Sequence, residues 1–63
     1  MKDVIKGQLV NLAKKIEGAE DEFEQWLLVM QYDGIAQDAI QNDIITQPEV
    51  TAIAREYSPS FAK

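Results

Sequence analysis

Apolar side chains recur along the first half of the chain at alternating steps of four and three residues. This spacing is typical of α-helices that pack along one face. It therefore predicts helix over the whole stretch, either as one helix or as two. We call this set of positions the heptad seam, and its members are Ile5, Leu9, Leu12, Ile16, Ala19, Phe23, Trp26 and Met30.

Gly18 interrupts the heptad seam and leaves two arrangements open. In the first, one long helix runs through Gly18 and pairs with a second copy, although a glycine inside a helix costs about 1 kcal/mol relative to alanine. In the second, two helices fold back on each other as a hairpin. Lys14 and Lys15 suit the end of a first helix, and Gly18 could end it in a left-handed conformation. Asp21 and Glu24 have the spacing of an N-cap and its partner at the start of a second helix.

The second half of the heptad seam is expected to supply the centre of the core. Every residue from Trp26 to Met30 is apolar, so a helix here should be covered on more than one side. In the hairpin arrangement, Phe23 would stack on Leu12 and Trp26 on Leu9. We therefore place Phe23 and Trp26 in the core.

Two further helices are expected in the second half of the chain. Asp33 follows an apolar run and can cap the first of them. Thr46 and Glu49 have the spacing of a capping box, which indicates where the last helix begins. We predict an all-α fold, a small bundle of three to four short helices at about residues 3–16, 21–31, 34–43 and 47–57. A single domain would then span residues 1–57, followed by a short C-terminal tail at residues 58–63.

The charges are divided unevenly along the chain, whose net charge is −5. Residues 1–15 carry four lysines and one acid, whereas residues 16–54 carry nine acids and no base. Such a chain should repel nucleic acids and anionic membranes and attract proteins with a basic surface. We therefore expect no direct binding to nucleic acid and no association with a membrane.

The residue types that carry most chemistry are absent or isolated. The chain has no cysteine and no histidine, which removes the commonest metal ligands and the commonest general base. Ser58 and Ser60 lack a base that could activate them. We expect no catalytic residue, no cofactor and no metal site. No apolar run approaches the ~20 residues that span a bilayer, and no signal-peptide pattern follows Met1, so we expect a cytoplasmic product that begins at Met1.

The acids near the middle of the seam are the best candidates for binding a partner. They are Glu17, Glu20, Asp21, Glu22 and Glu24, and their spacing gathers them about one helix start. They predict an acidic, non-enzymatic protein-binding module, for example an inhibitor that covers the nucleic-acid-binding surface of a basic partner. Small inhibitors encoded by phages or mobile elements act in this way, and the comparison is by class only.

Two alternatives remain open at this point. The chain could be a homodimeric scaffold subunit that self-associates through the heptad seam, since its large apolar residues are numerous for 63 residues. The acids could also serve only to keep the protein soluble.

Overall fold

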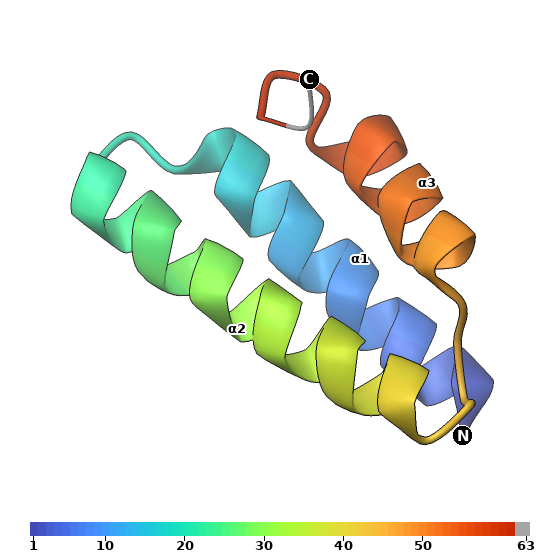
Figure 1. Cartoon of the computed structure of the whole chain (residues 1–63). Helices are drawn as coiled ribbons and strands as arrows, with labels where there is room; N and C mark the ends of the chain where they lie inside the picture. Colours follow the sequence, from blue (N-terminus) through green and yellow to red (C-terminus); the bar gives the residue numbers. More distant parts are fainter. Residues whose placement is uncertain (62–63) are drawn as a thin grey trace.

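The protein forms a bundle of three helices, seen here in a computed structural model that describes residues 1–61. The helices are α1 (Lys2–Gly18), α2 (Glu22–Gln41) and α3 (Gln47–Tyr57), and no strand occurs between residues 1 and 61. α1 lies between the other two helices. α2 is antiparallel to α1, and α3 runs in the same direction as α1 (Figure 1). The predicted all-α bundle is confirmed.

The chain folds back between α1 and α2, so the structure shows the hairpin and not the single long helix. α1 ends at Gly18, but no glycine in residues 1–61 has a positive φ, and the predicted left-handed role of Gly18 is wrong. Ala19 ends the helix instead, in an extended conformation, and its N–H donates to the carbonyl of Ile16 at 3.3 Å. Asp21 caps α2 as predicted, because its carboxylate accepts a hydrogen bond from the backbone N–H of Phe23 at 3.2 Å.

α2 continues as one helix through Gly34, and the predicted break between residues 31 and 34 is wrong. Asp33 and Gly34 locally favour a turn. A glycine inside a helix costs about 1 kcal/mol relative to alanine. Tertiary packing overrides that preference, because Tyr32, Ala36 and Ala39 are all buried against the rest of the bundle. A helix broken at Gly34 would lose this packing.

Gly34→Ala is expected to raise the free energy of unfolding by about 0.5–1 kcal/mol. Gly34 lies in a helix without a positive φ, and apart from its chain neighbours and the adjacent backbone of its own helix no atom lies within 4 Å of the position that a Cβ would take. Gly18→Ala should act in the same direction with a smaller effect, because Gly18 is the last residue of α1. Urea unfolding followed by circular dichroism measures both changes. A loss of stability at Gly18 would show that the helix ends there in a left-handed turn after all.

α3 begins and ends where the sequence predicts. The side chain of Thr46 accepts from the N–H of Glu49, and the carboxylate of Glu49 accepts from the N–H of Thr46, so the capping box is complete. Pro48 lies in the first turn, where its missing N–H costs little. After α3, Ser58 is buried and donates its hydroxyl proton to the carbonyl of Ala13 in α1. Of the predicted tail at 58–63, residues 62–63 lie outside the described part of the chain.

The core lies where the three helices meet. α1 contributes one continuous stripe, and α2, the loop before α3, and α3 pack onto it. The buried apolar residues are Leu9, Leu12, Ala13, Ile16, Tyr32, Ala36, Ala39, Ile45, Val50 and Ile53.

The heptad seam is buried in α1 at Leu9, Leu12 and Ile16, with Ile5 partly buried, but it is exposed in α2. Phe23, Trp26 and Met30 lie on the surface, so the prediction that Phe23 and Trp26 belong to the core is wrong. The physical reason is the loop at residues 19–21, which reverses the chain and removes the fixed rotation that links the two halves of a continuous helix. Burial of the later residues of α2 then sets the rotation of that helix.

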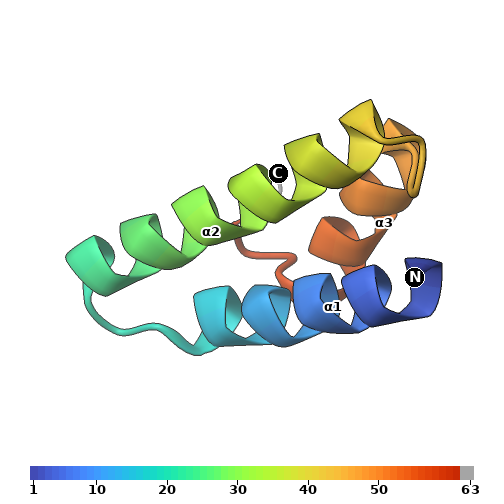
Figure 2. The same ribbon diagram turned by 90° about the horizontal axis from the view of Figure 1, so that it is seen from below.

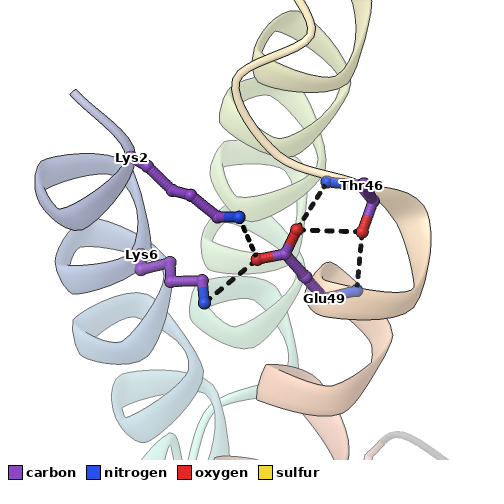
Figure 3. A network of polar contacts seen from close by, with 4 residues as sticks. All are labelled: Lys2, Lys6, Thr46 and Glu49. Atoms are coloured by element: carbon purple, nitrogen blue, oxygen red, sulfur yellow. Dashed lines mark hydrogen bonds and ion pairs between the residues drawn. The ribbon is translucent and has the colours of Figure 1, made fainter.

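One glutamate ties the starts of α1 and α3 together (Figure 3). The carboxylate of Glu49 lies 3.0 Å from the ammonium groups of both Lys2 and Lys6, while it also serves the capping box with Thr46. The hydrogen bonds from Lys2 and then Lys6 lower the pKa of Glu49 to about 2. Glu49 therefore stays ionised throughout the physiological pH range.

Candidate protein-binding surface

Four large apolar side chains lie together on the outer face of α2. The exposed fractions are 64% for Phe23, 57% for Trp26, 40% for Leu27 and 51% for Met30. Their spacing of three, four and seven residues from Phe23 places them on one side of a helix. We call this set the outer stripe.

The rotation of α2 explains why the outer stripe faces solvent. Tyr32, Ala36 and Ala39 point to the core and lie on the opposite side of the helix from the stripe. The hydroxyl of Tyr32 donates to the carbonyl of Val50 in α3 at 2.7 Å, which fixes this rotation with a buried hydrogen bond. The outer stripe is therefore held in place by the same contacts that build the core.

The outer stripe also lies beyond the reach of α3. α3 meets α1 near Lys2 and Lys6 at its start and near Ala13 at its end. The end of α1 and the first turns of α2 extend past that point, at the end of the molecule where the α1–α2 loop lies (Figure 2). No described element of the chain covers the stripe there.

Two aromatic rings of the stripe support each other. The ring centroids of Phe23 and Trp26 are 6.3 Å apart, with the planes inclined at 36°. This separation is within the range of favourable aromatic pairs. The pair therefore presents two adjacent aromatic rings to solvent.

Acids border the outer stripe on both sides. On the helical wheel, Glu22 and Asp33 flank the side of Trp26, and Glu24 flanks the side of Leu27. All three acids are exposed, and within residues 1–61 none of them makes an ion pair. We call these three residues the acid rim. The sequence prediction included Glu22 and Glu24 but missed Asp33, because it placed a turn at that position.

The other predicted partner-binding acids divide between two places. Glu20 and Asp21 lie in the loop just before α2 and are exposed beside the acid rim. Glu17 accepts hydrogen bonds from the N–H of Ser60 at 3.1 Å and from its hydroxyl at 2.6 Å, so it holds the segment after α3. The structure therefore brings Glu20, Asp21, Glu22 and Glu24 together and gives Glu17 a structural contact.

The lysines of α1 are largely occupied by contacts within the chain. Lys2 and Lys6 bind Glu49, and the ammonium group of Lys14 lies 5.4 Å from the ring centroid of Tyr57 in α3. Such a cation–π contact contributes on the order of 0.5–1 kcal/mol at an exposed site. Lys2, Lys6 and Lys14 thus serve the α1–α3 contact, whereas Lys15 lies at the end of α1 and lines one hollow with Glu20 and Glu24.

Outside the outer stripe, the described part of the chain has two hollows. A hollow of about 150 Å³ lies between the three helices and is lined by Ile16, Val29, Tyr32, Ala54 and Phe61 among others. This volume is below the roughly 300–1,000 Å³ of most pockets for organic ligands. A larger and more open hollow of about 410 Å³ lies at the α1–α2 loop and is lined by Lys15, Gly18, Ala19, Glu20 and Glu24. Between residues 1 and 61, no group of three acids is arranged to hold a metal ion. In the same range, no helix has both the length and the apolar character that a membrane crossing requires.

Comparison with protein-family models, with curated proteins and with solved structures gives no match for this chain. The surface of α2 is therefore the basis for the function proposed below.

The sequence pattern predicted none of the outer stripe at the surface, and Leu27 was not among the candidate residues at all. It lies off the heptad seam, in a run that is apolar on all sides. The rotation of α2 could have been inferred from residues further along the chain. Tyr32, Ala36 and Ala39 share one face, and the two alanines are small enough for close helix packing.

Proposed function

We propose that this protein is an acidic, non-enzymatic binding module that attaches to a basic surface of a partner protein through the outer face of α2. The observation that supports the proposal is the outer stripe, four large apolar side chains exposed side by side in a small chain. Contiguous exposed apolar patches commonly mark interaction sites. The absence of enzymatic activity and a cytoplasmic location remain predictions.

The composition of the surface also favours binding. Aromatic residues and methionine are enriched in the centres of protein interfaces, and tryptophan is among the residues whose loss costs most affinity. Phe23, Trp26 and Met30 supply these types at the centre, and the acid rim supplies charge around them. Rim charges of one sign speed association with a partner of the opposite sign and discourage others.

Where that basic surface is the one with which the partner binds nucleic acid, occupying it makes this protein an inhibitor or regulator of the partner. The acids about the start of α2 then take the place of phosphates. Adding nucleic acid should displace the protein from such a partner.

Self-association through the whole heptad seam has less support. Leu9, Leu12 and Ile16 are already buried inside the chain. A second copy would have to bind through Phe23, Trp26 and Met30, with acid rim facing acid rim.

The proposal predicts that binding depends on the acid rim and not on net charge alone. The double variant Glu22→Gln/Glu24→Gln should lose captured basic proteins and show a weaker dependence on salt. The matched control is Asp3→Asn/Glu56→Gln, which changes the net charge equally at exposed acids on α1 and α3. Affinity capture from cell extract at low and high salt, quantified for the three proteins, measures the difference. Equal capture by all three would show that the acids only keep the protein soluble.

A further inference from the structure

We infer that the partner segment received by the outer stripe is a basic amphipathic α-helix, with apolar residues along its centre and lysine or arginine along both edges. This inference rests on the proposed function and specifies the partner of the same surface. Three observations support it: the spacing of the stripe, the hydrogen-bonded helix backbone beneath the stripe, and the charges on its two sides.

The spacing of the stripe matches helix-on-helix packing. Phe23, Trp26 and Met30 follow steps of three and four residues, so they form a nearly straight ridge of about two turns, roughly 10 Å long, on α2. Ridges of this period pack against a second helix at a shallow angle of about 20°, as in coiled coils. The apolar residues of the partner would sit between Phe23, Trp26 and Met30.

The backbone around the stripe disfavours an extended partner. A peptide strand binds by adding to the free edge of a sheet, where unpaired N–H and C=O groups are available. The stripe lies within α2, whose backbone groups are bonded along the helix, and no strand exists between residues 1 and 61. Side chains alone are available for contact, and a second helix uses side chains alone.

The charges decide between a basic partner and a second copy. The acid rim has members on both sides of the stripe, so a helix lying along it would place its edge residues beside Glu22 and Asp33 on one side and Glu24 on the other. A second copy bound in this way would bring acids against acids, which is destabilising. Within residues 1–61, the basic residues of a second copy lie on α1 and α3, and Lys2 and Lys6 are bound to Glu49. A separate helix with an apolar centre and basic edges complements both the outer stripe and the acid rim.

Synthetic peptides provide a direct test, because Trp26 is the only tryptophan in the chain and lies in the stripe. The probe is a helical peptide without tryptophan or tyrosine, with leucine at heptad positions and lysine at the flanking positions. One comparison peptide has glutamate in place of lysine, and another has serine in place of leucine. We expect the basic amphipathic peptide to shift the emission of Trp26 to the blue in a saturable manner, and to bind at least about tenfold more tightly than either comparison peptide.

Variants then locate the contact. Leu27→Ser/Met30→Ser should weaken peptide binding about tenfold or more while leaving Trp26 as the reporter. Val4→Ser is the matched control, because Val4 is an exposed apolar residue on α1, and it should leave binding unchanged. Circular dichroism confirms that each variant is folded.

The outcomes separate this inference from the proposed function. Equal binding of the acidic and basic peptides would overturn the inference, as would a blue shift that rises with protein concentration alone and so reports a second copy. A blue shift produced by neutral lipid vesicles and not by the peptide would also overturn it. If the serine peptide binds as tightly as the leucine peptide and the stripe variant is unaffected, the helical partner is wrong, while binding to basic surfaces stands. The proposed function fails separately, through equal capture by the acid-rim and control variants.

Discussion

Leu9→Ala is expected to lower the free energy of unfolding by about 3–4 kcal/mol. Leu9 has no exposed surface and lies in the middle of α1, the helix that packs against both α2 and α3. Truncating a buried leucine removes its apolar burial and leaves a cavity that its neighbours fill only in part. For a chain of this size, such a loss is comparable to the whole stability of the fold, so much of the variant should be unfolded at room temperature.

Urea unfolding followed by circular dichroism measures this effect, and Trp26→Ala is its matched control. Trp26 is the larger side chain, but 57% of it is exposed, so its truncation should change stability by less than about 1 kcal/mol. The native emission of Trp26 should likewise resemble that of solvent-exposed indole. If Trp26→Ala destabilised the protein as much as Leu9→Ala, the rotation of α2 described above would be wrong.

Tyr32→Phe is expected to lower the free energy of unfolding by about 1–2 kcal/mol at neutral pH. The change removes the hydroxyl that donates to the carbonyl of Val50 at 2.7 Å and so cuts the buried polar link between α2 and α3. Tyr57→Phe is the control, because the described hydrogen bonds of the chain do not include the Tyr57 hydroxyl and its ring contact with Lys14 is retained.

The burial of the Tyr32 phenol also predicts a dependence on alkaline pH. Burial, followed by the charge of Asp33, raises the pKa of Tyr32 above its usual value of 10.0. The folded state therefore holds the phenolic proton more tightly than the unfolded state does. This contribution to stability is complete below pH 10 and is lost as the pH rises through the raised pKa. Urea midpoints of the wild type and of Tyr32→Phe should converge above pH 10, and a constant difference would contradict the role given to the hydroxyl.

Local signals in the sequence predicted the ends of helices well where a side chain caps the backbone. Thr46 and Glu49 bond to each other's backbone within four residues, so the start of α3 does not depend on the rest of the fold. The same is true of Asp21 at the start of α2. The predicted break at Gly34 was wrong because the backbone there is decided by tertiary packing and not by a local contact. A glycine preference of about 1 kcal/mol is outweighed here because Tyr32 and Ala36, two residues away in each direction, are buried.

The acids of the candidate surface were recognisable from the sequence, whereas the apolar centre was not. The charge of residues 16–54 is a property of the composition alone, and four of the five predicted acids do lie together around the start of α2. Phe23 and Trp26 were predicted in the core because the sequence does not show which other residues, if any, cover an apolar side chain. Its period shows that a helix face is apolar, and the contacts of the whole bundle determine whether that face points inward.

The sequence by itself determined that this chain is helical, that it is acidic from residue 16 to residue 54, and where α2 and α3 begin. These properties depend on groups a few residues apart or on composition. Only the tertiary structure decided that the chain folds back after Gly18, that α2 runs unbroken through Gly34, and that α2 is rotated to bury Tyr32, Ala36 and Ala39. Rotation of a helix that is apolar nearly all round depends on which side packs most closely against its neighbours. That choice places Phe23, Trp26, Leu27 and Met30 in solvent and creates the surface to which we assign the function.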